Sequence, residues 1–579
     1  MKRNHTVSLC MIVKNEGRYL RRCLSSVSDI VDEIVIVDTG SSDDTVQIAK
    51  EFGAVLGYFE WNQNFSDARN QALALATKEW ILVLDADEYL RLEDRDKLIK
   101  AFNDFNYDGY IIKTLNFNGD DNNQAFITNL NQRIFKNNKN YTYKGAIHEQ
   151  VICLNPDKQK NEFKIIDVGF YHSGYLATIV QGKNKPNRNL EILKEVAKED
   201  PSNTFTLFNL ANEYSQLNDL EEAFRLYDEA YKKESFTVGF MPKLVIFRLQ
   251  CLINMNRTEE ALQAIEEGLK AYPDYTELVY YRALLEKKLG QITKTIQSYK
   301  KCLEMGKPRD EIEFQQICYD FGPTFGLAEI YEEQQDYARA IEYYNKCLML
   351  DSSKFQLLYP IFRCLDGLKI SKFDRVQLLA KYFKLTLTLN QIVFIDILVT
   401  GACYEEAKEF LIQCTELNTN SQLIFLHARV EFYLKNYREA EKLFLQYSKS
   451  TDLADVEAYL YSIHLITNEK SNVKWSEFYE NLESHLVEGQ DLHFENQNQA
   501  IVQSCILMRE LYLCKELTWF EKIAQLASEF VTSDTTLQLA GLLLEAKYHQ
   551  LAEQIIVKSI KASGKCSREE ALLLTKILQ

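Results

Sequence analysis

The segment Trp80-Ile81-Leu82-Val83-Leu84-Asp85-Ala86-Asp87-Glu88 decides the fold of the first part of this chain. An unbroken apolar run that ends in acidic residues is typical of a short strand buried on both faces of a sheet. Two earlier segments, 7–13 and 33–38, have the same form, and helical stretches follow them at 19–28 and 46–52. Strands that alternate with helices predict an α/β domain with a parallel sheet covered on both faces.

The acidic residues at the ends of these strands predict a ligand site. In open α/β sheets the ligand crevice lies beyond the carboxyl ends of the strands. Asp85 and Asp87 carry oxygen ligands of the kind that Mg²⁺ or Mn²⁺ prefers, and such an ion would neutralise a diphosphate. Asp38 and Glu16 follow two other strands and are placed to contact a nucleoside. The alternative is structural: these acids would be solvated residues at capped strand ends, or helix N-caps.

Four motifs in this part of the chain resemble family 2 glycosyltransferases. They are Ser8-Leu-Cys-Met-Ile-Val-Lys-Asn-Glu16, Glu33-Ile-Val-Ile-Val-Asp-Thr-Gly-Ser-Ser-Asp-Asp-Thr45, Asn64-Phe-Ser-Asp-Ala-Arg-Asn70 and Leu84-Asp-Ala-Asp-Glu88. The resemblance covers roughly the first third of the chain. It implies the GT-A fold, a nucleotide-sugar donor that is most often a UDP-sugar, and a transfer that usually inverts the anomeric centre.

The same resemblance implies roles for individual residues. The backbone from Ile12 to Glu16 and the carboxylate of Asp38 would hold the uracil and the ribose. Asp87 would be the main ligand of a Mn²⁺ or Mg²⁺ ion. The residues expected to bind the nucleotide sugar are Ile12, Val13, Asn15, Glu16, Asp38, Ser41, Arg69, Asn70, Asp85, Ala86 and Arg188.

Residues 101–190 predict the acceptor side of the site. Eleven asparagines lie between 103 and 140, which favours a loop-rich stretch that faces an acceptor. Further on, Lys144-Gly-Ala-Ile-His148-Glu149 resembles the acceptor-side segment of such enzymes.

Inverting transfer needs one carboxylate to take the proton of the acceptor. We expect Glu149 to be this base, with His148 beside it in the catalytic segment and with Asp85 and Glu88 as the next choices. The alternative is that His148 and Glu149 tie a loop to the sheet.

His172 and a basic cluster complete the predicted site. His172 lies between aromatic residues, and the resemblance to GT-A enzymes implies that a histidine downstream of two such carboxylates can complete a metal shell with Asp87. A histidine packed in the core is the alternative. The cluster formed by Lys183, Lys185 and Arg188 would clamp the diphosphate as a closing loop, or would be a solvated basic linker.

Composition limits the class of protein. The net charge of the 579-residue chain is -16, of which residues 1–190 carry -1 and residues 191–579 carry -15. This acidity argues against a nucleic-acid binder. No apolar run reaches the about 18 to 20 residues that span a bilayer, and the start lacks the pattern of a signal peptide. The 13 cysteines are odd in number and form no C-x-x-C pair. We therefore expect reduced, mostly buried thiols and a cytoplasmic protein.

The second part of the chain has a repeat period near 34 residues. Small residues recur at helix crossings, with aromatic residues one turn on; the clearest copies lie between 204 and 352, and insertions loosen the pattern near 305–320 and 465–530. The pattern resembles tetratricopeptide repeats, which stack into a superhelix that commonly binds polypeptide. The alternative is a dimerisation platform or a supporting buttress.

The sequence therefore predicts an α/β GT-A domain at 1–190 followed by an all-α superhelix of tetratricopeptide repeats at 191–579. We expect an inverting, metal-dependent glycosyltransferase that moves a sugar from a UDP-sugar to a Ser, Thr or Cys side chain of a peptide or protein in the repeat groove. A thiol would need less help from the base than a hydroxyl, because Cys is more acidic. The alternatives are a saccharide or cell-surface polysaccharide acceptor, or a repeat protein whose main role is interaction. A homodimer is possible in each case.

Overall fold

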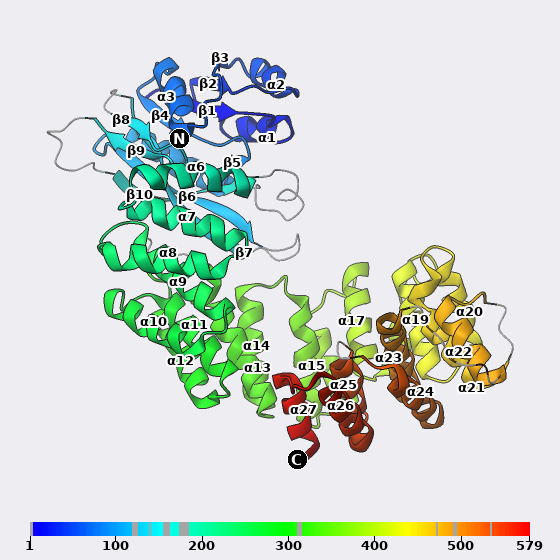
Figure 1. The fold of residues 1–579 in the computed structure, drawn as a ribbon. Coiled ribbons are helices and arrows are strands. Elements are labelled where there is room, and N and C mark those ends of the chain that lie inside the picture. The colour runs from blue at the N-terminus through cyan, green and yellow to red at the C-terminus, as the bar shows by residue number, and fades with distance from the viewer. Residues whose placement is uncertain are drawn as a thin grey trace. The chain divides into compact units, whose positions relative to one another are not determined.

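The computed structural model describes residues 4–118, 125–137, 141–154, 163–172, 185–309, 315–469, 473–488, 490, 492, 494, 496–532 and 535–578. The chain forms two compact units, Met1–Leu350 and Asp351–Gln579. The first unit holds a sheet domain and a stack of helices, and the second is helical (Figure 1).

One eight-stranded sheet organises the first unit, in the order β3-β2-β1-β4-β7-β6-β10-β5. Its strands are β1 (Val7–Val13), β2 (Glu33–Asp38), β3 (Val55–Tyr58), β4 (Trp80–Val83), β5 (Glu88–Leu90), β6 (Gly109–Asn118), β7 (Ala125–Lys136) and β10 (Phe163–His172). β8 (Tyr141–Lys144) and β9 (Gln150–Cys153) form a separate pair. β1 to β4 are parallel, as the alternating pattern predicts.

The remainder of the sheet corrects the prediction of a wholly parallel arrangement. β7 is antiparallel to both β4 and β6, and β5 is antiparallel to β10. Consecutive strands such as β6 and β7 can pair antiparallel through a short connection, whereas a parallel pair needs a crossover element. The sheet is therefore mixed, and the parallel half carries the strand ends that the sequence pointed to.

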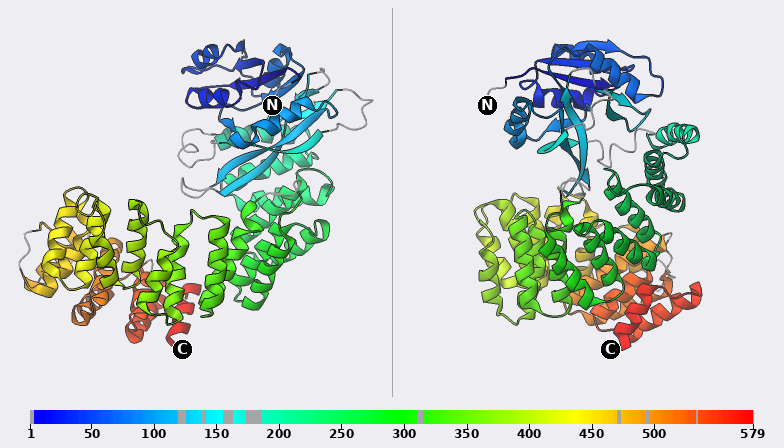
Figure 2. Two further views of the ribbon diagram at one scale, coloured as in Figure 1. Left: turned by 180° about the vertical axis from the view of Figure 1, so that it is seen from behind. Right: turned by 90° about the vertical axis from the view of Figure 1, so that its left-hand side faces the viewer.

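Helices cover both faces of the sheet, as predicted (Figure 2). Alternate residues of β1 divide between the two cores: Leu9 and Met11 pack with α1 and α4, whereas Cys10 packs with α3. The helices are α1 (Gly17–Val27), α2 (Thr45–Glu51), α3 (Phe65–Leu75) and α4 (Arg95–Asn103). β1, β2 and β4 are thus buried on both sides, which explains their continuous apolar runs.

The asparagine-rich stretch is not loop-rich in its described part, so this prediction was wrong. It forms most of β6 and β7, the longest paired strands of the sheet. The register shifts between Tyr110, which pairs with Ile134, and Ile111, which pairs with Gln132. Arg133 therefore has no partner residue on β6. Arg133 is therefore the extra residue of a β-bulge, a feature that re-aims a side chain.

Helix pairs with buried small residues at their crossings confirm the repeat prediction. Ala211, Ala223 and Ala283 are fully buried. The helices of the first unit's stack are α6 (Lys185–Glu199), α7 (Thr204–Gln216), α8 (Leu220–Lys233), α9 (Met241–Asn254), α10 (Thr258–Ala271), α11 (Thr276–Lys288), α12 (Ile292–Met305), α13 (Phe321–Glu333) and α14 (Tyr337–Leu350).

The second unit continues with helices of similar length, including the region near 465–530 where the repeat pattern is weak. They are α15 (Leu358–Gly367), α16 (Lys372–Ala380), α17 (Thr388–Thr400), α18 (Tyr404–Ile412), α19 (Ser421–Tyr433), α20 (Tyr437–Ser448), α21 (Glu457–Thr467), α22 (Glu477–Glu488), α23 (Gln497–Leu513), α24 (Leu517–Phe530), α25 (Thr536–Glu545), α26 (His549–Ser563) and α27 (Arg568–Leu578). Among the described residues, no helix is both long and apolar enough to cross a membrane. None of the 13 cysteines, all of which are among the described residues, forms a disulfide, and most are buried, as expected.

Two glycines in helices test how tightly the helix stack is packed. At Gly326 of α13 an added Cβ would lie 2.5 Å from the buried ring of Tyr299, whereas at Gly541 of α25 it would meet no atom within 4 Å. Gly326→Ala is expected to lower the free energy of unfolding by about 1 to 3 kcal/mol through overpacking. Gly541→Ala is expected to raise it by about 0.5 to 1 kcal/mol, because alanine favours the helix. Urea denaturation of both variants checks this, and equal effects would contradict it.

Candidate active site

The acidic segment that follows β4 forms a tight turn at the centre of the sheet. Ala86 is buried in the core, and the carboxylates of Asp85 and Asp87 on either side of it remain 35% and 17% exposed. The backbone N–H of Asp85 donates to Glu88 Oε2 at 2.9 Å, and that of Glu88 donates to Asp85 O at 3.0 Å. These bonds fix the three carboxyl groups at one end of the strand.

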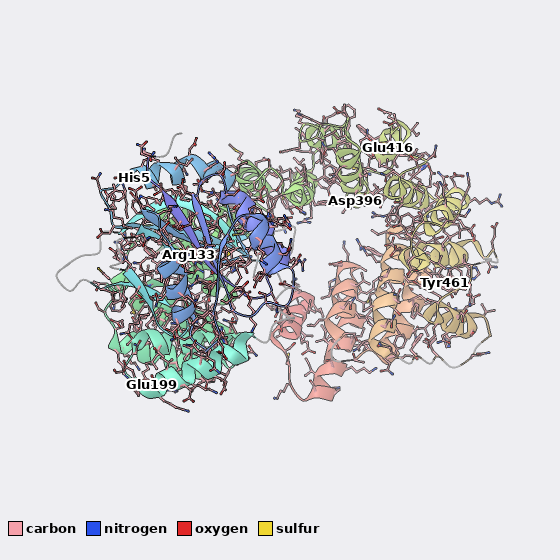
Figure 3. The ribbon with its side chains drawn as sticks, turned by 90° about the horizontal axis from the view of Figure 1, so that it is seen from above. His5, Arg133, Glu199, Asp396, Glu416 and Tyr461 are labelled. Carbon is pink, nitrogen blue, oxygen red and sulfur yellow. The ribbon has the colours of Figure 1, made fainter. Side chains whose placement is uncertain are left out.

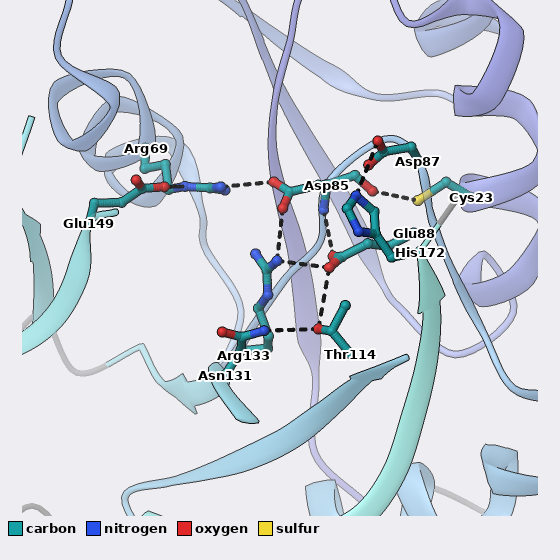
Figure 4. A network of polar contacts seen from close by, with 10 residues as sticks. All are labelled: Cys23, Arg69, Asp85, Asp87, Glu88, Thr114, Asn131, Arg133, Glu149 and His172. Atoms are coloured by element: carbon teal, nitrogen blue, oxygen red, sulfur yellow. Dashed lines mark hydrogen bonds and ion pairs between the residues drawn. The ribbon is translucent and has the colours of Figure 1, made fainter. Parts of the chain in front are cut away.

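Two arginines hold the carboxylate of Asp85 between them (Figure 4). Arg69 Nη2 donates to Oδ1 and Arg133 Nη2 donates to Oδ2, each at 2.8 Å. Burial alone would raise the pKa of Asp85, but the charges of Arg133 and Arg69 and their hydrogen bonds hold it well below its usual value. Asp85 is therefore ionised throughout the range in which proteins function.

Glu88 shares Arg133 with Asp85, but its pKa is shifted in the opposite direction. Arg133 Nη2 donates to Glu88 Oε1 at 2.8 Å, and the side chain of Glu88 is 2% exposed. Burial raises the pKa of Glu88 and outweighs the opposing charge of Arg133. Asn131 Nδ2 donates to Thr114 Oγ1 at 2.9 Å on the same side of this cluster. Arg133 itself lies within the sheet domain (Figure 3).

Arg69 also joins this cluster to the predicted base. Its Nε donates to Glu149 Oε1, while its Nη2 donates to Asp85. The guanidinium also lies 5.5 Å from the ring centre of Tyr143, an aromatic cation contact. Arg69 thus connects the segments of Asp85 and Glu149, which the sequence analysis assigns to one site.

Asp87 and His172 lie beside each other, as a shared metal would require. Asp87 Oδ2 is 3.3 Å from His172 Nε2, and both side chains are about four-fifths buried. Burial would lower the pKa of His172, but the hydrogen bond and charge of Asp87 raise it. A carboxylate and an imidazole suit Mn²⁺ or Mg²⁺ that keeps waters and substrate oxygens as further ligands. The described residues contain no group of three or more His, Cys, Asp or Glu arranged for a metal.

The predicted nucleoside residues form two interlocked loops at the ends of β1 and β2. Ser41 Oγ accepts from Asn15 N at 2.9 Å, and Asn15 Oδ1 accepts from Ser42 N at 2.7 Å. Asp38, 4% exposed, accepts from the backbone of Gly40 and Ser41. Residues Ile12 and Val13 pair with Val37 and Asp38 across the two strands, and Glu16 N donates to Thr45 Oγ1.

Three predicted residues lie elsewhere. Asn70 fastens α3 to β8, since its Oδ1 accepts from Tyr143 N and its Nδ2 donates to Tyr143 O. His148 points toward the helices, with its Nε2 3.8 Å from Glu213 Oε1 of α7. Arg188 lies in the first turn of α6, but its side chain, like Lys183 and the side chain of Lys185, lies outside the described residues.

Sequence reasoning missed the roles of Arg133 and Glu213. The sequence offered one signal for Arg133: the apolar pair Ile134-Phe135 follows it directly, which indicates a buried segment. Glu213 has no distinguishing signal, because charged residues are ordinary in repeat helices.

Comparison with known proteins agrees with the strands and loops of this site. Residues 8–154 match glycosyl transferase family 2, and residues 206–232 and 325–353 match tetratricopeptide repeats. An uncharacterized glycosyltransferase of Rickettsia typhi is 32% identical over 219 residues, which are 36% of this chain and 73% of that protein. The chain belongs to glycosyl transferase family 2.

Two further relatives match this family 2 glycosyltransferase beyond the sheet domain. A TPR repeat-containing protein of Synechococcus elongatus is 30% identical over 333 residues, 57% of this chain and 71% of that protein. The SPbeta prophage-derived glycosyltransferase SunS of Bacillus subtilis is 28% identical over 288 residues, 48% of this chain and 66% of that protein. The chain spans about two thirds of the length of these relatives.

Arg133 is expected to be essential for the stability of this family 2 site. Arg133→Met leaves Asp85 and Glu88 together without the guanidinium, and removing one partner of a buried ion pair costs about 3 to 5 kcal/mol. The loss in the free energy of unfolding should be larger at pH 8 than at pH 5. The folded-state pKa of Glu88 is already raised, so its protonation as the pH falls favours the folded variant. Urea denaturation at both pH values measures this.

The matched control is Arg225→Met, which removes the exposed pairs with Glu222 and Glu229 on α8. Such surface pairs contribute under about 1 kcal/mol. A loss for Arg133→Met no greater than for this control, or one that grows toward pH 5, would contradict the proposed role of the buried pair.

Proposed function

We propose that this protein is an inverting glycosyltransferase that moves a sugar from a UDP-sugar to a Ser, Thr or Cys side chain of a polypeptide bound by its repeats. The observation that carries the proposal is the shared contact of Arg69 with Asp85 and Glu149. It brings a carboxylate from the acceptor-side segment to the acidic strand end, where the donor of a family 2 enzyme is expected.

The donor would lie across the ends of β1, β2 and β4. Asp38, with the loops that hold Asn15 and Ser41, would bind the nucleoside. Two buried donors support an oxygen-rich ligand near Asp85: Arg69 Nη1 and Arg133 Nε have no hydrogen-bond partner among the described residues. Buried polar groups are normally satisfied, and diphosphate or sugar oxygens would satisfy these two.

Asp87 and His172 would hold a Mn²⁺ or Mg²⁺ ion. When bound, such an ion neutralises charge on the diphosphate of the donor. Asp85 and Glu88 would not serve as ligands, because Arg69 and Arg133 already occupy their oxygens. Their part is to fix the turn that presents Asp87.

Glu149 would act as the general base. It would take the proton of the acceptor hydroxyl or thiol while the acceptor oxygen or sulfur bonds to the sugar carbon from the face opposite the diphosphate. The bond from that carbon to the diphosphate breaks, and UDP leaves with the electron pair. Arg69 would orient the carboxylate during this step, because it holds Oε1.

The repeats would supply the acceptor. Tetratricopeptide arrays bind polypeptide segments, and the negative charge of residues 191–579 favours a basic or polar segment. SunS, a glycosyltransferase by name, matches this chain over 288 residues, which is more than the sheet domain alone contains.

Asp87→Asn tests the metal. Calorimetric titration with UDP should show tighter binding by the wild type when Mn²⁺ is present, and the variant should lose this gain by at least about tenfold, the loss that even an outer metal contact causes. Asp29→Asn, which removes an exposed carboxylate paired with Arg95, should behave as the wild type. Equal Mn²⁺ enhancement in all three proteins would contradict the assignment.

Glu149→Gln tests the base. UDP release from a panel of UDP-sugars, with and without polypeptides from the host, should fall by about 10² to 10⁴ in kcat, the usual contribution of a general base. The affinity for UDP should change much less than kcat, because the nucleoside would bind to the loops of Asn15 and Ser41, whereas Glu149 contacts Arg69. If the wild type binds and releases no UDP-sugar, the transferase proposal fails and a role in interaction is favoured.

A further inference from the structure

The segment Gly145–Glu149, the catalytic loop, lies between the sheet domain and the first repeat. On the sheet side it is fastened to the start of α3: Phe65 N donates to Ala146 O at 2.8 Å, and Ser66 Oγ donates to Gly145 O at 2.6 Å. Its last residue, Glu149, binds Arg69 of the same helix. The loop that carries the proposed base is therefore supported by α3 on one side.

The first repeats support the other side of the catalytic loop. The side chain of Ile147 packs against the hydrophobic core that α7 to α11 form. The next residue, His148, places Nε2 3.8 Å from Glu213 Oε1 of α7, within ion-pair distance. One residue of the loop thus makes an apolar contact with the repeats and the next makes a polar one.

Glu213 is one of several buried glutamates in the described helices, and it faces the catalytic loop. Its side chain is only 3% exposed, and Oε2 has no hydrogen-bond partner among the described residues. Oε1 accepts from Asn189 Nδ2 of α6 at 3.3 Å. A buried carboxylate is costly unless it is paired, so its position opposite His148 calls for an explanation. The helix fold alone does not supply one, because an apolar residue would pack there at lower cost.

The pairing of His148 with Glu213 would hold an uncommon backbone conformation of the loop. His148 has a φ of 52°, and Gly145 has a φ of 109°, so the loop passes twice through the left-handed region. Residues other than glycine adopt that region uncommonly, because Cβ crowds the backbone there. The contacts of Ile147 and His148 with the repeats are the surroundings that flank this position, and Glu149 follows directly.

We propose that Glu213 is a positioning residue of the first repeat: through His148 it fixes the catalytic loop, and the loop then holds Glu149 on Arg69. The inference rests on the proposed role of Glu149 as the base. Glu213 touches no substrate. It determines where the carboxylate of Glu149 stands, so the repeat array contributes to catalysis besides binding an acceptor.

Hydrogen–deuterium exchange of the full chain tests the positioning independently of activity. Glu213→Gln keeps the size of the side chain and removes its charge. Amide exchange in peptides that cover 145–149 should become about tenfold faster, with no change in peptides from β1 or β2. His148→Gln should have the same effect, and the double variant should exchange no faster than either single variant, because both changes break one contact.

Glu286→Gln is the matched control. Glu286 is also buried, at 8% exposure, but it accepts from Ser298 Oγ at 2.7 Å within the repeats. It should leave exchange at 145–149 unchanged. If it accelerates that exchange as Glu213→Gln does, or if Glu213→Gln has no effect there, the proposal is overturned.

Kinetics with the UDP-sugar on which the wild type is most active supply the second readout. Glu213→Gln should lower kcat for UDP release by about tenfold, while the dissociation constant of UDP stays the same. A change in UDP affinity with an unchanged kcat would overturn the positioning role. Absence of UDP release from the wild type would refute the proposed function, and the exchange experiment would still decide whether Glu213 fixes the loop.

Discussion

The guanidinium of Arg69 is the contact on which the candidate site depends. It is 8% exposed, so its charge is stable there only because Asp85 and Glu149 bind it on two sides. These carboxylates come from the end of β4 and from the loop before β9, segments that no regular strand pairing connects. One buried cation therefore decides how far apart the donor side and the acceptor side of the site lie. Arg133 repeats the same principle between Asp85 and Glu88.

The sequence revealed the parts of the site that depend on local pattern. Apolar runs that end in acids marked β1, β2 and β4, and parallel pairing then had to bring their ends together. Asp87 and His172, predicted as partners, lie 3.3 Å apart because β5 and β10 pair through Glu88 and His172. Specific motifs made this possible, since they fix both the strand and the residue that follows it.

What the sequence did not reveal depends on register and on neighbours distant in the chain. The asparagines of β6 and β7 suggested loops by composition, yet pairing along ten residues of each strand overrides that preference. The bulge that orients Arg133 is a register shift between β6 and β7. It cannot be predicted from the sequence of either strand alone. Asn70 was assigned to the donor by position, but its amide serves β8. The contact of Glu213 with the catalytic loop could not be predicted, because the sequence does not show which loop covers α7.

The contacts of the catalytic loop with the first repeats bear on how the repeat array of such proteins can vary. Repeat arrays lengthen and shorten by duplication and loss of whole repeats. The helices that receive Ile147 and His148 are excluded from this freedom, because their loss would expose the loop that bears Glu149. Changes in the number and sequence of repeats should therefore accumulate in the later repeats. The helices α6 to α11 should be inherited together with the sheet domain as one block. A chimera that joins two relatives would have to cut beyond that block to remain a working enzyme.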